Sequence, residues 1–239
     1  MAIEVIQPDV FLLGLRIQEP VTTITDLFVS AANFYGYYRI QKAGFTDNSR
    51  RFLKIYFLLM GFATALGGLL AHGFLYFFGD PWKIPGWFLS MIGIMFIERS
   101  AIEHSKNLVN KKTGSFFLKA NLVELAIMMS LAAYTLDFRV VEFHSAYGVL
   151  GVVLAFHLYV FRKTRDIGSR WFLWGVVLLI IATFIFNYPI IIDPWFTHAD
   201  FAHILMMIAT FFFIQGGLHL GKLPADTQRT SEVLATSES

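Results

Sequence analysis

Residues 171–192 read WFLWGVVLLIIATFIFNYPIII, an apolar run without a charged side chain. A helix needs about 20 apolar residues to cross the roughly 30 Å hydrocarbon core of a bilayer, so this run is long enough to span one. Other runs of the same kind lie at 20–40, 53–78, 86–107, 115–136, 141–161 and 199–221. The sequence therefore predicts an all-α, polytopic membrane protein built as a bundle of seven transmembrane helices.

The composition agrees with this class. The chain has 239 residues, of which 56% are hydrophobic and 15% charged, and its mean hydropathy is +0.59. Soluble proteins have about 25% charged residues, so a water-soluble domain is excluded. We expect one membrane domain over 1–221, followed by a disordered cytoplasmic tail over 222–239. The chain has no Cys, so any metal must be held by His, Asp or Glu.

The connections between the runs differ in charge. The second and fourth carry one cation each, Lys83 and Arg139, and the sixth carries none. By the positive-inside rule the basic connections are cytoplasmic, which places the N-terminus outside and the C-terminus inside. The net charge of +2 is then a topology signal and predicts no nucleic-acid partner. The cations of the odd connections are Arg39, Lys42, Arg50, Arg51 and Lys54, then Lys106, Lys111, Lys112 and Lys119, then Arg162, Lys163, Arg165 and Arg170.

Three ionisable residues are expected at one depth near the outer face. Asp26 follows the start of the first run, His72 precedes the end of the second, and His203 follows the start of the seventh. At about 1.5 Å per residue, each lies roughly 10 Å below the outer boundary. An ionisable group inside a membrane is costly and indicates a functional site. Asp26, His72 and His203 are therefore candidates for a metal centre.

The stretch HADFAH, residues 198–203, allows two interpretations. Thr197 and Asp200 have the spacing of a capping box, so Asp200 could satisfy backbone amides, and a lone His could be a hydrogen-bonding partner. Alternatively, Asp200 and His203 at i and i+3 face one metal ion together. His198 is five residues before His203, about 140° around the helix, and joins them only if the helix start is loosened.

A second polar layer is expected toward the cytoplasmic side. We interpret it mainly as a structural lock in which Arg99 pairs with Glu124 or Glu103, because a paired charge is less costly in the membrane. A proton path or a contact with a substrate headgroup is the alternative. The members are Glu98, Arg99, Glu103, His104, Lys119, Asn121, Glu124 and His157.

Three motifs carry a family resemblance. EPVTTITD at 19–26, GGLLAHGF at 67–74 and HADFAH at 198–203, on a predicted seven-helix bundle, resemble the superfamily of membrane hydrolases that contains the alkaline ceramidases and adiponectin receptors, and its bacterial members above all. The resemblance implies a zinc ion held by His72, His198 and His203. This sequence departs from the family pattern in two places. Gly68 stands where the family has Ser, and the two histidines of the seventh helix are separated by four residues where three are usual.

The resemblance implies zinc-dependent hydrolysis of an amide or ester in a membrane lipid, with Asp26 or Asp200 as general base. It suggests a multi-pass protein of a bacterial inner membrane. Two other functions stay open. One is a haem- or quinone-associated subunit, with a haem between His72 and either His144 or His203. The other is a non-catalytic scaffold or accessory subunit with partners in a membrane complex.

Overall fold

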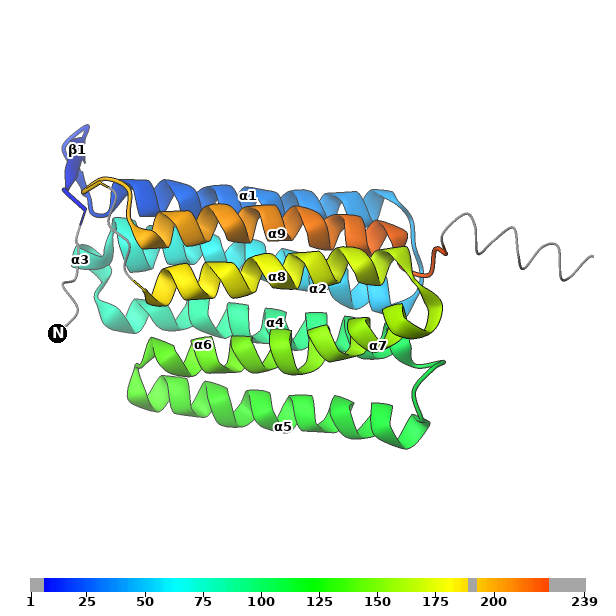
Figure 1. Cartoon of the computed structure of the whole chain (residues 1–239). Coiled ribbons are helices and arrows are strands. Elements are labelled where there is room, and N and C mark those ends of the chain that lie inside the picture. Colours follow the sequence, from blue (N-terminus) through cyan, green and yellow to red (C-terminus); the bar gives the residue numbers. More distant parts are fainter. Residues whose placement is uncertain (1–6, 189–192, 224–239) are drawn as a thin grey trace, which may run out of the picture.

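The computed structural model describes residues 7–188 and 193–223, and these are mostly helical (Figure 1). The long helices lie side by side along one axis. The helices of the described chain are α1 (Pro20–Lys42), α2 (Asn48–Leu66), the π-helix η1 (Gly67–Gly73), α3 (Leu75–Phe78), the 3-10 helix η2 (Asp80–Lys83), α4 (Ile84–Ser105), α5 (Lys111–Thr135), α6 (Phe138–Ala146), the π-helix η3 (Tyr147–Val153), α7 (Leu154–Thr164), α8 (Ile167–Asn187) and α9 (His198–His219).

Each predicted apolar run coincides with a helix, or with helices joined end to end, to within a few residues. Residues 189–192 of the run that ends at 192, and 224–239 of the predicted tail, lie outside the described residues. Five helical segments are long and apolar enough to cross a membrane. Helices α1 and α4 are of similar length and are not in this group. The five segments are 48–73, 111–135, 138–164, 167–187 and 198–219.

Polar residues at the helix starts explain where several helices begin. The first turn of a helix has amides without a partner, and a side-chain oxygen just before it can accept from them. The side chain of Asp47 accepts from the Arg50 amide, and that of Asp166 accepts from the Ser169 amide. Asn110 and Asp137 do the same before α5 and α6.

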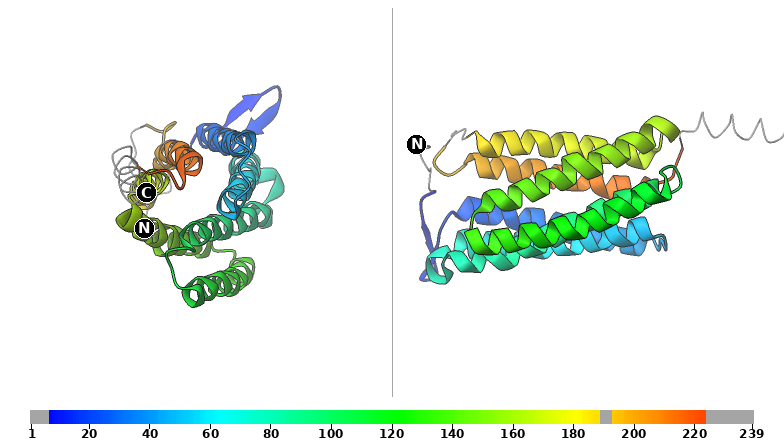
Figure 2. Two further views of the ribbon diagram at one scale, coloured as in Figure 1. Left: turned by 90° about the vertical axis from the view of Figure 1, so that its right-hand side faces the viewer. Right: turned by 90° about the horizontal axis from the view of Figure 1, so that it is seen from below.

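The helices form a ring when viewed along the bundle axis, with α5 on its outside (Figure 2). Helix α1 packs against α2 and α9, α2 packs against α4, and α8 packs against α9. Helix α5 packs against α4 and α6. The core is apolar and includes Leu53, Phe57, Phe172 and Phe213, each at most 1% exposed. Candidate site residues from different helices can therefore contact one another only where these helices pack together.

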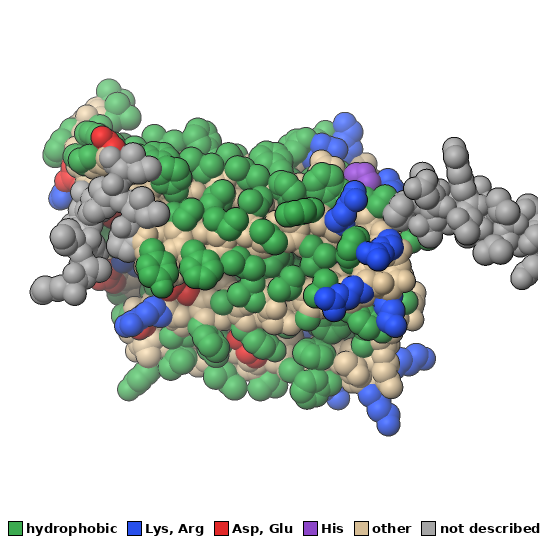
Figure 3. Space-filling view, viewed as in Figure 1, with side chains coloured by type: hydrophobic (Ala, Val, Ile, Leu, Met, Phe, Trp, Pro, Cys, Tyr) green, Lys and Arg blue, Asp and Glu red, His purple; other side chains and the backbone are tan. Residues whose placement is uncertain are grey.

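The surface has two regions of different chemistry. On the face drawn in Figure 3, hydrophobic side chains cover the flank of the bundle, while Lys and Arg gather at the end where α9 finishes. A wide apolar flank on a soluble monomer would be an aggregation hazard, whereas lipid covers it in a bilayer. The five spans and this flank identify the chain as a membrane protein.

Two kinds of local structure were not predicted from the sequence. A short antiparallel hairpin joins β1 (Val10–Leu12) to β2 (Leu15–Ile17) before α1. The π-helices η1 and η3 interrupt the helical segments 48–73 and 138–164. Such π-helices are rare, and those that occur are often at functional sites. One contains His72, and the other begins three residues after His144.

Candidate metal centre

The start of α1 is held by residues from outside the helix. Glu19 precedes the helix with φ 41°, in the left-handed region, and its side chain does not cap the helix. The buried Gln7 side chain takes over this role, because its Oε1 accepts from the amides of Val21 (3.0 Å) and Thr22 (3.3 Å). The first turn of α1 therefore has a fixed position, and Asp26 follows it on the buried side.

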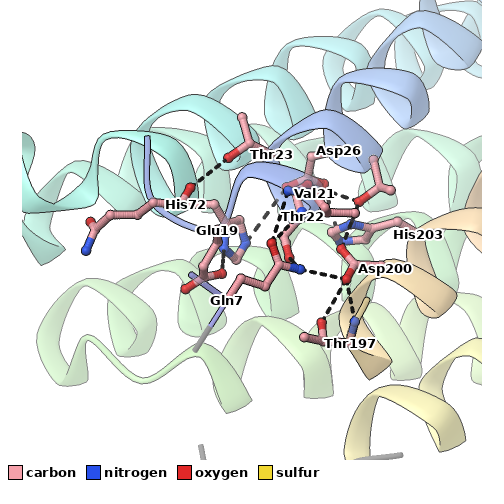
Figure 4. Close-up of polar contacts among 12 residues, drawn as sticks. Gln7, Glu19, Val21, Thr22, Thr23, Asp26, His72, Thr197, Asp200 and His203 are labelled. Carbon is pink, nitrogen blue, oxygen red and sulfur yellow. Dashed lines mark hydrogen bonds and ion pairs between the residues drawn. The ribbon is translucent and has the colours of Figure 1, made fainter. Parts of the chain in front are cut away.

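His72 approaches Asp26 from η1 (Figure 4). Its Nε2 lies 3.8 Å from Asp26 Oδ2, and its Nδ1 lies 2.6 Å from Glu19 Oε2. Burial alone would raise the pKa of the Glu19 carboxyl, but its hydrogen bond and attraction to His72, together with Lys83, lower it. An ionised carboxylate only accepts, so the proton of a neutral His72 sits on Nδ1 and the Nε2 lone pair faces Asp26.

Gly68 allows this approach. A Cβ at position 68 would lie 2.9 Å from Asp26 Cβ and 3.0 Å from the Thr23 carbonyl oxygen. Real Cβ atoms essentially never come this close to another atom without displacing it. The absence of the Ser found in the resembling family thus has a physical reason, because Asp26 of α1 fills the space that its side chain would need.

His203 approaches the same carboxylate from α9 (Figure 4). Its Nε2 lies 3.4 Å from Asp26 Oδ1, and its Nδ1 lies 3.0 Å from Thr25 Oγ1. The Thr25 hydroxyl has two other acceptors for its single hydrogen, the Thr22 carbonyl (3.0 Å) and Asp200 Oδ1 (3.3 Å), so we assign it the acceptor role toward His203. His203 therefore donates from Nδ1 to the hydroxyl, and its Nε2 lone pair also faces Asp26.

The sequence thus correctly predicted that Asp26, His72 and His203 meet. Both Nε2···O distances exceed the 2.7–3.2 Å of ordinary N–H···O bonds. Tetrahedral zinc, with bonds of about 2.0–2.2 Å, holds neighbouring ligand atoms about 3.4 Å apart. The rings are 6.5 Å apart between centroids and inclined at 73°. The ligand atoms of Asp26, His72 and His203 are too far apart to enclose an ion in this arrangement. Among the described residues, only Glu98, Glu124 and His144 bring three ligand atoms within 4.8 Å of one another.

The centre is more open on one side. The His72 side chain is 30% exposed, whereas those of Asp26 and His203 are 8% and 10% exposed. Water or substrate can therefore reach the carboxylate past His72.

Asp200 has a structural environment. It is fully buried, and its Oδ2 accepts from the Thr197 amide (2.6 Å), the Thr197 hydroxyl (3.0 Å) and Gln7 Nε2 (2.8 Å). Its Oδ1 lies 3.3 Å from the Thr25 hydroxyl. The capping box expected at Thr197 and Asp200 is present. Donors surround Asp200, so it ties α9 to α1 and to the N-terminal segment.

His198 does not join the other histidines. Helix α9 already includes His198 as its first residue, so the loosened start that would let it turn inward does not occur. Its ring packs against Phe186 of α8 at 5.9 Å, and its buried Nδ1 has no hydrogen-bond partner among the described residues. The angular offset of about 140° from His203 explains why the two rings face different neighbours.

The predicted pairing of Arg99 with Glu124 or Glu103 is wrong. Arg99 Nε donates to Asn121 Oδ1 at 3.1 Å, and the Asn121 amide donates to Glu98 Oε2 at 2.8 Å. The amide thus lies between the cation and a carboxylate. Glu103 pairs with Lys106 at 3.1 Å instead.

Glu124 of the predicted inner layer contacts His144, which was not among the expected members of that layer. His144 Nδ1 lies 2.9 Å from both carboxylate oxygens of Glu124. Depth counted along straight helices ignores helix tilt and the reach of a Glu side chain.

His157 belongs to neither group. It contacts Ser169 Oγ at 3.1 Å and stacks on Phe172 at 4.1 Å between centroids. The predicted inner layer is therefore not one network. Glu98, Arg99, Asn121 and Glu124 lie together, whereas Glu103, His104 and His157 contact Lys106, Asp166 and Ser169.

Sequence reasoning did not single out Gln7, Glu19 or Thr25 as site residues. Glu19 and Thr25 fix the imidazoles through their Nδ1 atoms, and Gln7 fixes Asp200. The polar face that Thr25 shares with Thr22 and Asp26 was a signal for Thr25. The sequence around Gln7 carries no comparable signal.

A search of curated proteins and a search of solved structures each gave no match to this sequence. A family profile matches residues 21–222 and so includes Asp26, His72, Asp200 and His203. The chain belongs to this family, which is described as a family of unknown function (DUF6962).

Proposed function

We propose that this protein is a membrane-embedded, metal-dependent hydrolase that acts on an amide or ester bond of a lipid. One observation carries the proposal. The Nε2 atoms of His72 and His203 lie 3.8 and 3.4 Å from the two carboxylate oxygens of Asp26, and with both rings neutral and protonated on Nδ1 the three groups face one another as acceptors. A cation between them removes the repulsion, and two nitrogens with one carboxylate oxygen are a donor set that zinc uses in catalytic sites.

The residues behind the ligands support a metal ion. Histidines that bind metals usually have the other ring nitrogen hydrogen-bonded to a carboxylate or another acceptor. Glu19 holds His72 in this way and Thr25 holds His203. These contacts fix the tautomer in which Nε2 is free, so both rings are prepared to bind an ion.

An ion bound there would polarise a carbonyl group and acidify a water molecule. Asp26 has two oxygens, and each faces a different imidazole. One oxygen can bind the ion while the other accepts a proton from the attacking water. We assign the general-base role to Asp26 because donors already occupy Asp200.

We further propose seven membrane spans with the N-terminus outside. Helices α1 and α4 belong to the same ring of helices, and each packs against at least two of the five apolar segments. The gathering of Lys and Arg at one end supports a cytoplasmic location for that end (Figure 3). The metal centre then lies near the outer face, and acyl chains reach it from the bilayer. A bacterial inner membrane fits this arrangement.

The haem alternative receives less support. A haem bound between His72 and His203 needs a slot wide enough for a porphyrin, whereas Asp26 and Thr23 occupy the space between η1 and α1. His144 is engaged through both ring nitrogens, by Glu124 and by the Met91 carbonyl. An accessory subunit without catalysis is the remaining alternative.

The decisive experiment measures metal content and hydrolysis on the same detergent-purified protein. Zinc, iron and manganese are quantified by mass spectrometry, an absorption spectrum reports haem, and fatty-acid release is followed from an N-acyl sphingolipid and a glycerolipid ester. We expect His203→Ala and Asp26→Asn to lose the metal ion of this centre and hydrolysis with it. His198→Ala, a variant of the same helix, should keep both. Full metal retention in a His72→Ala, His203→Ala double variant would contradict the proposal.

A further inference from the structure

A second group of ionisable side chains lies on helices that contribute nothing to the first centre. Glu98 of α4, Glu124 of α5 and His144 of α6 bring one ligand atom each within 4.8 Å of one another. Glu98 and His144 are fully buried, and the Glu124 side chain is 17% exposed. Two ionised carboxylates this close in a membrane interior repel each other unless a proton or another cation lies between them.

The imidazole of His144 has a defined orientation. Its Nε2 lies 3.0 Å from the Met91 carbonyl oxygen, which can only accept, so Nε2 carries a hydrogen. Its Nδ1 lies 2.9 Å from both oxygens of Glu124, a hydrogen-bond distance, so a proton lies between them and is the one that a bound cation would replace. A backbone carbonyl behind a ligating imidazole is a usual second partner in metal sites.

Glu98 is held from one side only. Its Oε2 accepts from Asn121 at 2.8 Å, while its Oε1 is buried without a hydrogen-bond partner in the described chain. Arg99 does not supply the missing donor, because its bonds go to Asn121 Oδ1 and the Leu118 carbonyl. A buried carboxylate oxygen without a donor is costly, and a bound cation would satisfy it.

Gly148, in the π-helix η3, makes room for that oxygen. A Cβ at position 148 would lie 2.6 Å from Glu98 Oε1 and 2.4 Å from Ile94 Cγ2. The carboxylate thus fills a space that any other residue would occupy. Gly151, in the same π-helix, has only the Tyr147 ring near its Cβ position, at 3.4 Å.

We propose that Glu98, Glu124 and His144 form a second metal site, which binds a divalent cation of the Mn²⁺, Fe²⁺ and Zn²⁺ group. Carboxylates suit Mn²⁺, and an imidazole extends the choice to Fe²⁺ and Zn²⁺. Asn121 orients Glu98, and the Met91 carbonyl orients His144. The ion displaces the proton between His144 and Glu124, and it supplies a positive charge beside Glu98 Oε1. This proposal does not depend on the hydrolase activity proposed for the first centre.

The test uses the full-length protein in detergent, with His203→Ala in the background so that the first centre does not contribute. Protein stripped with a chelator is reloaded with Mn²⁺ or Zn²⁺ and freed of excess ion by gel filtration. Mass spectrometry then gives the metal content, and electron paramagnetic resonance gives the state of Mn²⁺. We expect about one ion per chain, and at least tenfold weaker binding in Glu98→Gln and Glu124→Gln.

The matched controls are on the same elements. Glu103→Gln removes a carboxylate of α4 that pairs with Lys106, and it should leave the ion in place. Gly148→Ala should weaken binding, whereas Gly151→Ala should not. The proposal is overturned if the folded background protein binds no ion. It is equally overturned if bound ion is insensitive to Glu98→Gln, Glu124→Gln and Gly148→Ala.

Discussion

Gly68→Ser places in this chain the residue that the resembling hydrolases have, and we expect it to damage the metal centre. The new Cβ would lie 2.9 Å from Asp26 Cβ, whereas ordinary contacts begin at 3.4 Å, so one group must move by at least 0.5 Å. The Thr23 carbonyl oxygen, at 3.0 Å, blocks the other direction because it belongs to the α1 backbone. Asp26 is therefore displaced from its place between the two imidazoles.

The size of the effect follows from this displacement. Metal–ligand distances in proteins vary by only about 0.2 Å, so a 0.5 Å shift of Asp26 would break its bond to the ion. We expect metal affinity to fall about 10- to 100-fold, as when a supporting hydrogen bond is lost. Overpacking costs about 1–3 kcal/mol, and each kcal/mol lowers the melting temperature of a chain of this size by about 2–4 °C.

Gly67→Ser is the matched control. A Cβ at position 67 meets only Asp26 Oδ2, at 3.4 Å, which is an ordinary contact. Zinc titration with a competing chelator gives the affinity, and a thermal melt in detergent gives the stability. If Gly68→Ser binds zinc as tightly as Gly67→Ser, or if it raises hydrolytic activity, then α1 and η1 do not approach as described and Asp26 does not replace the family's Ser.

Three further predictions concern other parts of the molecule. Thr25→Val removes the Nδ1 partner of His203 and should weaken metal binding about 10- to 100-fold. Thr210→Val loses only a bond to its own helix and should not weaken it, and a competition titration compares the two variants. Burial alone would raise the pKa of Asp166, but hydrogen bonds from His104 and the Ser169 amide lower it, so its stabilisation is present above the unfolded value of about 3.9 and is lost as pH falls below it. Asp166→Asn should therefore flatten the acid limb of a melting-temperature profile. Reporters after Leu223 and near Lys83 should behave as cytoplasmic and external, and a reversed result would overturn the proposed orientation.

The helices were predictable because a span needs a long apolar run, and this signal is written in the sequence alone. The meeting of Asp26, His72 and His203 was predictable for a related reason. All three lie within a few turns of one end of the bundle, so counting residues from that end places them at one depth.

Partners across the middle of the bundle were not predictable in this way. His144 and Glu124 meet because α5 packs against α6 and because a Glu side chain is long. Counting depth reveals neither which helices are neighbours nor which face each turns inward. The π-helices change the direction in which side chains point. They depend on packing between helices, so no local sequence pattern predicts η1 or η3.

Hydrogen bonding distinguishes the roles of Asp26 and Asp200, which the sequence left as alternative candidates for the general base. Asp200 and Asp26 both lie near His203, but the oxygens of Asp200 face amide and hydroxyl donors, whereas those of Asp26 face imidazole lone pairs. A buried carboxylate surrounded by donors is already satisfied, and its role is structural. One surrounded by acceptors needs a proton or a metal ion, which makes it a candidate metal ligand.

The same comparison distinguishes the two glutamates of α4. Glu103 has the Lys106 ammonium group at 3.1 Å and needs no further partner. Glu98 Oε1 has no donor in the described chain, and it lies in the space left by Gly148. A buried carboxylate with too few donors thus occurs in two places, at Asp26 and at Glu98, on different helices, and these are the two places where we propose a cation. Each place is next to a π-helix, where an added residue per turn re-aims the side chains and a glycine lets the carboxylate approach.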